Sequence, residues 1–196
     1  MSNPDAAVFQ RLGGRLPEIA SLWKGDGLQA AVLVALTEES VPRVILGRRA
    51  QHLRLHPGEI AFPGGKREPE DQSHWSTALR EAHEEIGLEP ALVRPLGEMP
   101  VFLTRSEFQV HPCVAVVPAK FDMVVDPTEM ESAFLVPLED FARKENYRLE
   151  EMTGQHGMQM VPHYQIGKDN IWGMTATVLA QLVNLALDAR LDLEKN

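Results

Sequence analysis

The chain has 196 residues, of which 44% are hydrophobic and 24% charged, so it is long enough for one globular domain with a sizeable core. Its formal net charge of −9 opposes non-specific binding to a phosphate backbone and argues against a long nucleic acid as partner. A single cysteine, Cys113, excludes an internal disulfide, and no apolar run reaches the roughly 18 residues of a membrane span. The first residues lack a secretory pattern. We therefore expect one domain over residues 1–196, located in the cytoplasm and away from membranes.

The first part of the chain predicts a helix followed by two strands. A short amphipathic helix is expected within residues 5–23, ending near Gly13 and Gly14. The apolar run of residues 30–37 and the shorter run of residues 43–46 lie on either side of a turn and are typical of a hairpin of buried strands. Two buried strands this early favour a mixed sheet over a helical bundle.

A basic segment follows the second strand, although the chain as a whole is acidic. It contains Arg48, Arg49 and Arg54. Guanidinium groups suit bidentate recognition of phosphate, so the segment predicts a phosphate-rich ligand. The alternative is an ordinary solvated loop.

Residues 64–88 predict a loop that leads into a helix. The loop is rich in Gly, Pro and charge, and Ser73 or Asp71 is the expected N-cap. Gly87 follows the last apolar turn, where a left-handed residue often ends a helix. One face of the helix is apolar and carries Trp75, Leu79, Ala82 and Ile86.

The other face of this helix carries three carboxylates. Glu81, Glu84 and Glu85 stand at positions i, i+3 and i+4 and so share one side. Unpaired like charges at that spacing destabilise a helix, whereas hard divalent cations favour a cluster of oxygen ligands. The pattern therefore indicates either a site for a hard divalent cation such as magnesium, manganese or calcium, or a solvated acidic face.

The second half of the chain predicts strands, an acidic loop, a hairpin and a final helix. In chain order these are expected over residues 92–103, 109–117, 126–131, 134–138, 152–165 and 171–188. Together with the first half, this succession indicates an α/β or α+β fold.

Three segments together resemble the signature of the Nudix hydrolases. They are Phe62-Pro63-Gly64-Gly65, then Asp71, then the run REAHEEIGL at residues 80–88. The last nine positions match in full, with Ala82 as a small aliphatic residue. The acid in the loop is Asp71 rather than Glu, and one extra residue separates it from Arg80.

The resemblance implies a Nudix-type α/β/α sandwich around a mixed β-sheet, with a Nudix box over residues 65–88. It also implies metal-dependent hydrolysis of a diphosphate with Mg2+ or Mn2+. Glu81 and Glu85 would be the principal ligands, Glu84 a further ligand or water-positioning group, and Arg80 the residue that orients a carboxylate.

A narrower resemblance concerns the residues upstream of the box. The pattern Leu46-x-Arg48-Arg49-Ala50, Arg54, Gly58 and Phe62-Pro63-Gly64-Gly65 resembles that of coenzyme A pyrophosphatases, which also tend to carry the Asp and the extra residue in the box. It implies cleavage of coenzyme A or an acyl-CoA into 3′,5′-ADP and 4′-phosphopantetheine. The residues implied at the substrate are Arg48, Arg49, Arg54, Gly58, Phe62, Gly64 and Gly65.

Several alternatives stay open. The substrate could be ADP-ribose, NADH or another nucleoside diphosphate derivative, or the chain could be a Nudix-fold sensor that binds a nucleotide without cleaving it. In some Nudix proteins an acid in the loop before the Val-Pro-Leu strand acts as base or extra ligand, which points weakly to Glu129 or Glu131. A homodimer is possible.

None of the seven histidines is assigned a metal. His52, His56 and His83 lie near the predicted carboxylate site, but no pair of them has a zinc spacing with a third ligand.

Overall fold

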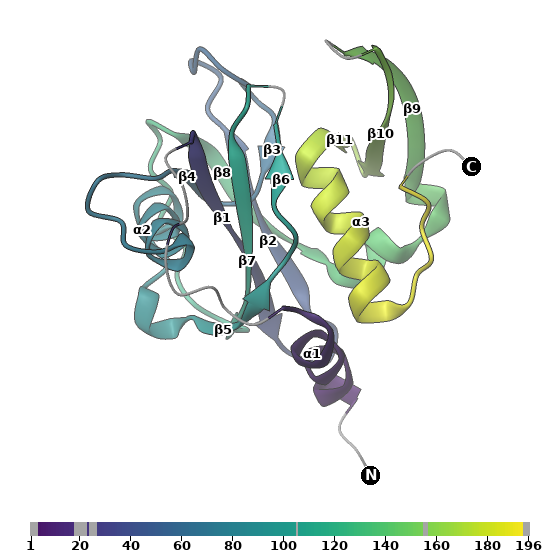
Figure 1. Ribbon diagram of the computed structural model, residues 1–196. Coiled ribbons are helices and arrows are strands. Elements are labelled where there is room, and N and C mark those ends of the chain that lie inside the picture. Colours follow the sequence, from purple (N-terminus) through teal and green to yellow (C-terminus); the bar gives the residue numbers. More distant parts are fainter. Residues whose placement is uncertain (1–3, 18–22, 24–26, 105, 155–156, 194–196) are drawn as a thin grey trace.

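A mixed β-sheet lies between helices in the computed structural model, which describes residues 4–17, 23, 27–104, 106–154 and 157–193. Helix α2 (His74–Ile86) covers one face of the sheet. Helices α1 (Pro4–Arg15) and α3 (Gly173–Leu187) lie on the other face (Figure 1). This is the predicted α/β/α sandwich, and the mixed sheet is confirmed. None of the helices in the described part of the chain combines the length and apolar character that a membrane crossing requires.

Strand β1 (Gln29–Glu38) is the centre of the large sheet. It pairs antiparallel with β2 (Arg43–Arg49), as the predicted hairpin requires, and parallel with β7 (Gln109–Pro118) over ten residue pairs from Gln29 and Gln109 onward. The remaining strands of this sheet are β3 (Ile60–Ala61), β4 (Gly64–Lys66), β5 (Arg94–Glu98), β6 (Phe102–Leu103) and β8 (Met130–Pro137). The strand β4 is the start of the Nudix-like loop, and it pairs with β1.

Both faces of β1 are buried, which explains its unbroken apolar sequence. Val32, Val34 and Leu36 pack in the cluster that includes α3, whereas Leu33 and Ala35 pack in the cluster that includes α2. Each Val or Leu buried in this way contributes about 1.5–3 kcal/mol to folding. The second cluster holds α2 against one face of the sheet, and the first holds α3 against the other.

Helix α2 begins and ends as its sequence predicts. Ser73 is the N-cap: its side chain accepts a hydrogen bond from the backbone N–H of Ser76 at 3.1 Å, and the Ser76 hydroxyl accepts one from the Ser73 N–H at 2.8 Å. Asp71, the other candidate for the N-cap, instead accepts hydrogen bonds from Arg80, Thr77 and the Glu68 N–H. Gly87 ends the helix in the left-handed conformation with φ of 68°.

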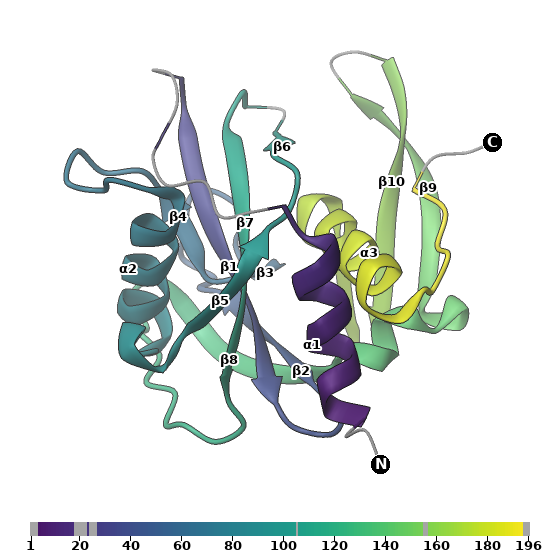
Figure 2. The same ribbon diagram turned by 60° about the horizontal axis from the view of Figure 1, so that its bottom comes forward.

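The N-terminal helix that the sequence predicts within residues 5–23, ending near Gly13 and Gly14, is confirmed. Helix α1 continues through Gly13 and Gly14 but ends at Arg15, and residues 18–22 lie outside the described residues. Pro17 disfavours a helical conformation in the residue before it. The Arg15 guanidinium donates to the Leu185 carbonyl oxygen at 2.7 Å, so the end of α1 is attached to the end of α3 (Figure 2).

The strand predicted over residues 92–103 is divided in the structure. Residues Pro90–Leu92 form a 3-10 turn, β5 ends at Glu98, and β6 begins only at Phe102. Pro100 lies in the gap, where its missing N–H cannot contribute to a ladder.

A small antiparallel sheet completes the fold. It consists of β9 (Tyr147–Gly154), β10 (Gly157–Ile166) and β11 (Asp169–Trp172), in the order β11-β10-β9. The predicted hairpin is thus confirmed, although β9 starts earlier than residue 152. The final helix starts at Gly173 rather than at residue 171, because Ile171 and Trp172 pair with β10.

We expect Ser73→Ala to lower the free energy of unfolding by about 0.5–2 kcal/mol, because the Ser76 N–H loses its acceptor at the helix start. Urea unfolding followed by circular dichroism measures the change. Ser40, exposed in the turn between β1 and β2, is the matched control, and Ser40→Ala should change stability by less than about 0.5 kcal/mol. Equal losses in the two variants would contradict the capping role.

Candidate active site

Three carboxylates meet at one side of α2. Glu81 and Glu85 project from the helix, and Glu129 comes from the turn before β8; one oxygen of each lies within 4.8 Å of the others. The turn is attached to the helix because the Asp126 N–H donates to the Glu85 carbonyl oxygen at 3.0 Å. We call these three residues the carboxylate group.

The structure separates the two acids of the loop that the sequence left as alternatives. Glu129 lies in the carboxylate group, whereas Glu131 accepts a hydrogen bond from the Gln51 amide at 3.2 Å. Glu131 comes one residue after Met130, the first residue of β8, and Met130 is fully buried. Glu131 is exposed, at the point where the register between β2 and β8 shifts.

Glu85 is the most buried member, with 1% of its surface exposed. Burial raises the pKa of Glu85 to about 8; the hydrogen bond from the Gly64 N–H at 2.9 Å opposes this shift, and Glu81 and Glu129 add to it. Burial also raises the pKa of Glu81. Crowded, buried carboxylate oxygens of this kind fit a hard divalent cation, whose charge would balance theirs.

Arg80 connects the loop to the carboxylate group. Its guanidinium lies 3.1 Å from Glu81 Oε1 and 2.9 Å from Asp71 Oδ2, and it also donates to the Lys66 carbonyl oxygen at 3.1 Å. Such multiple bonds hold a carboxylate in a fixed orientation. Arg80 is thus placed beside Glu81, and its orienting role stays a prediction.

Asp71, the departure from the general signature, is buried and fully engaged. It accepts hydrogen bonds from Arg80, from the Thr77 hydroxyl at 2.8 Å and from the Glu68 N–H at 2.9 Å. Burial alone would raise the pKa of Asp71, but these bonds hold it below its ordinary value. An aspartate thus anchors the loop to the helix.

Glu84 lies apart from the carboxylate group. Its side chain is half exposed and forms an ion pair with Arg80 at 2.9 Å. Its role as a further ligand or water-positioning group stays a prediction.

Two glycines let the loop pass close to the sheet and the helix. A Cβ on Gly64 would lie 2.4 Å from the carbonyl oxygen of Ala31, and one on Gly65 would lie 2.3 Å from Glu81 Oε1. Gly64 also supplies the N–H that binds Glu85. Both residues therefore position the carboxylate group.

The three arginines of the basic segment have different surroundings. Arg49 lies close enough to Glu85 to oppose the rise in the pKa of that carboxyl, and its Nε is buried without a hydrogen-bond partner in the described part of the chain. Arg48 forms an ion pair with Asp169 of β11 at 2.9 Å. Arg54 is exposed on the loop between β2 and β3.

Gly58 and Phe62 stabilise the loop between β2 and β3 and the segment that follows it. Gly58 has φ of 71° and donates its N–H to the Arg49 carbonyl oxygen at 3.0 Å, which closes the loop. Phe62 is 2% exposed and packs in the core. The structure therefore shows both residues holding the loop, while contact with a substrate stays a prediction for them.

Comparison with known proteins identifies the family. Residues 27–153 match the family model of the NUDIX domain. The chain belongs to the Nudix family. It is 36% identical over 154 residues to the protein named Uncharacterized Nudix hydrolase NudL in Yersinia pestis (strain Pestoides F), a match that covers 79% of this chain and 77% of NudL. NudL of Yersinia pseudotuberculosis serotype O:1b (strain IP 31758) matches to the same extent.

A solved Nudix structure shows the same fold. The crystal structure of a Nudix hydrolase from Alicyclobacillus acidocaldarius aligns with 88% of this chain and 100% of that chain, with a TM-score of 0.51 and 19% identity. As a Nudix hydrolase, the chain acts on a phosphorus-containing anhydride. Nudix hydrolases generally use divalent metal ions, which agrees with the donors of the carboxylate group.

We expect Glu129→Gln to weaken Mn2+ binding by on the order of tenfold or more, since even outer-shell partners of metal ligands contribute that much. Titration of the purified chain with Mn2+, followed by electron spin resonance, measures the affinity. Glu131→Gln makes the same change two residues further along and should leave the affinity unchanged. The assignment is wrong if the two variants lose affinity equally, or if neither loses any.

We expect Gly65→Ala in the Nudix box to disturb the site without unfolding the chain. The new methyl group would push the end of the Glu81 side chain, which can move. Mn2+ affinity and the hydrolysis rate should fall by roughly tenfold, while the melting temperature changes little. Gly14→Ala is the control, because nothing lies within 4 Å of a Cβ there and alanine favours the helix by about 0.5–1 kcal/mol. Unchanged Mn2+ affinity in Gly65→Ala would contradict the proposed contact.

Proposed function

We propose that this Nudix hydrolase cleaves the diphosphate bond of coenzyme A or an acyl-CoA. The products would be 3′,5′-ADP and 4′-phosphopantetheine or its acyl form. The observation that carries the hydrolytic part is the carboxylate group, in which the buried Glu85 lies beside the half-buried Glu81 and the exposed Glu129. The substrate rests on the resemblance of the Arg-Gly segment upstream of the box to that of coenzyme A pyrophosphatases.

In this proposal Glu81 and Glu85 would hold Mg2+ or Mn2+, with Glu129 as a third ligand and Glu84 as a further ligand or water-positioning group. The ion would neutralise charge on the phosphate oxygens and make water a better nucleophile at neutral pH. The protein keeps its ligands in place in advance: Arg80 holds Glu81, and the Gly64 N–H holds Glu85. Such preorganisation means that little rearrangement is needed during the reaction.

The arginines divide the phosphates of the substrate between them. Arg49 lies beside the carboxylate group and suits the diphosphate, where its buried Nε would gain an acceptor. Arg54 is exposed on the loop and suits the 3′-phosphate. Arg48 is bound to Asp169, so it would act on the substrate mainly by fixing the loop.

The partner of the chain in this proposal is a small anionic molecule rather than a nucleic acid or a membrane. The net charge of −9 opposes binding to a large anionic surface, whereas the local basic segment can bind the phosphates of a small molecule. A cytoplasmic location and a homodimer stay predictions.

The decisive assay incubates the purified chain with coenzyme A, dephospho-coenzyme A, ADP-ribose and NADH, each with Mg2+ or Mn2+, and separates the products by chromatography. We expect coenzyme A to yield 3′,5′-ADP and to react fastest. Glu85→Gln should lower the rate by on the order of 100-fold, because it removes a charged donor from the metal site. Chelation of the metal should stop the reaction.

The other outcomes are equally informative. Faster cleavage of ADP-ribose or NADH would keep the hydrolase and remove the coenzyme A assignment. Equal rates with dephospho-coenzyme A, which lacks the 3′-phosphate, would remove the role of Arg54. Binding of a nucleotide without cleavage would indicate a sensor.

A further inference from the structure

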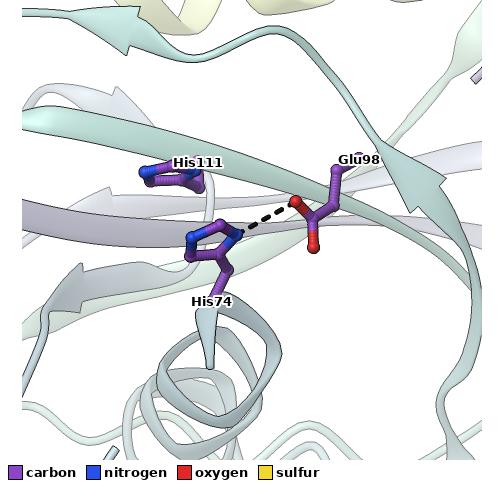
Figure 3. A group of neighbouring side chains, drawn as sticks. All are labelled: His74, Glu98 and His111. Atoms are coloured by element: carbon purple, nitrogen blue, oxygen red, sulfur yellow. Dashed lines mark hydrogen bonds and ion pairs between the residues drawn. The ribbon is translucent and has the colours of Figure 1, made fainter. Parts of the chain in front are cut away.

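A second cluster of metal-type side chains lies at the start of α2. His74 is the first residue of the helix, Glu98 is the last residue of β5, and His111 lies in β7 (Figure 3). His74 precedes Glu81 by seven residues, about two helical turns or roughly 10 Å along the axis, so the cluster is separate from the carboxylate group. The proposed diphosphate hydrolysis does not use it.

The three side chains converge on a small buried volume. Glu98 Oε2 lies 3.0 Å from His74 Nδ1, and the imidazole rings of His74 and His111 stack with centroids 3.6 Å apart (Figure 3). One ligand atom from each residue lies within 4.8 Å of the others. Their exposed fractions are 5% for His74, 7% for Glu98 and 9% for His111.

Two polar atoms of this cluster lack partners. Glu98 Oε1 and His111 Nε2 are buried and form no hydrogen bond with any residue that the structure describes. A buried polar atom without a partner destabilises the fold, and such atoms therefore call for an explanation. A carboxylate oxygen and an imidazole nitrogen are both metal ligands, so a bound cation would satisfy both at once.

The indole of Trp23 covers the cluster. Its ring meets the edges of His74 and His111 with centroids 4.4 Å and 5.2 Å away. Burial, with a contribution from His74, lowers the pKa of His111 to about 4, so its imidazole is neutral at physiological pH and offers a lone pair. Exclusion of water by an apolar ring is also what keeps a bound ion from exchanging freely.

We propose that His74, Glu98 and His111 bind a divalent transition-metal ion of the zinc type, at a second site that holds the start of the box helix to β5 and β7. Two imidazoles and one carboxylate are a zinc-type donor set, in contrast to the oxygen donors of the carboxylate group. Zinc ligands lie about 2.0–2.2 Å from the ion, so tetrahedral donors are roughly 3.4 Å apart. The rings of His74 and His111, which are stacked in this structure, would have to turn so that one nitrogen of each faces the ion.

The test uses the full-length chain, treated with a chelator, and titrates it with Co2+ and with Zn2+ alone. Co2+ held by histidine in a site of low coordination number absorbs strongly in the visible range, whereas Co2+ among carboxylates and water absorbs weakly. We expect one equivalent of strongly absorbing Co2+, displaced by Zn2+, and a rise in melting temperature with Zn2+. A wild-type chain without these bands overturns the proposal, whatever the variants do.

Four variants locate the ion. Glu98→Gln, which is nearly isosteric, and His111→Gln should lose the bands and the thermal shift. Glu85→Gln, in the carboxylate group, should retain both. His83→Gln controls for surface binding, because His83 forms an exposed pair with Glu89 at 3.2 Å. Bands that persist in both cluster variants, or that vanish in His83→Gln, would refute the assignment.

A measurement on the wild-type chain covers the case in which the cluster variants do not fold. Imidazole nitrogen resonances are recorded by NMR during the Zn2+ titration, and those of exposed histidines are identified with His83→Gln and His56→Gln. The resonances of the third buried histidine, His163, are identified with His163→Gln, and the proposal requires that the other two, His74 and His111, shift with one equivalent of Zn2+. Shifts confined to exposed histidines would reject it.

Discussion

The hydrogen bond from the Gly64 N–H to the Glu85 carboxylate is the interaction on which the site depends. It joins β4, which pairs with the central strand β1, to the helix that covers that strand. Burying a carboxylate is unfavourable unless hydrogen bonds or an opposite charge compensate. One backbone N–H offsets only part of that penalty, as the raised pKa of Glu85 indicates. Without a cation the raised pKa favours a proton on Glu85, and a cation that binds here would displace that proton and stabilise the carboxylate.

In the same loop, Asp71 is a buried carboxylate whose charge is already balanced by Arg80. Asp71 and Arg80 form an internally compensated pair that needs no ion, and the pair fixes the loop on the helix. The charge of Glu81 is balanced only in part, since Glu81 contacts Arg80 and also lies close to Glu85 and Glu129. The box thus contains acids that are already neutralised by the chain and acids that are not. This difference in local charge balance, rather than the number of acids, distinguishes Asp71, which anchors the loop, from the carboxylate group.

Local signals in the sequence predicted local structure well. The buried run of β1, the cap at Ser73, the glycine stop at Gly87 and the β9–β10 hairpin each depend on nearby residues, and the structure has all four. The strand with Pro100 was not predicted to divide. The choice of Glu129 over Glu131 depends on the turn before β8, which the Asp126 N–H attaches to Glu85 of α2. The cluster of His74, Glu98 and His111 depends on the β5–β7 register, which pairs Glu98 with Cys113 two residues beyond His111, and no sequence spacing reveals it.

The parallel pairing of β1 with β7 also has a consequence for how the chain folds. Gln29 pairs with Gln109, so this ladder joins residues on opposite sides of the whole box segment. Contacts between residues far apart in sequence require closure of a large loop, and proteins rich in them fold slowly. The sheet face that receives α2 is complete only when this ladder is formed, so the burial that raises the pKa of Glu85 depends on residues far away in the sequence. The cation site is thus a product of the long-range sheet and not of the box segment alone.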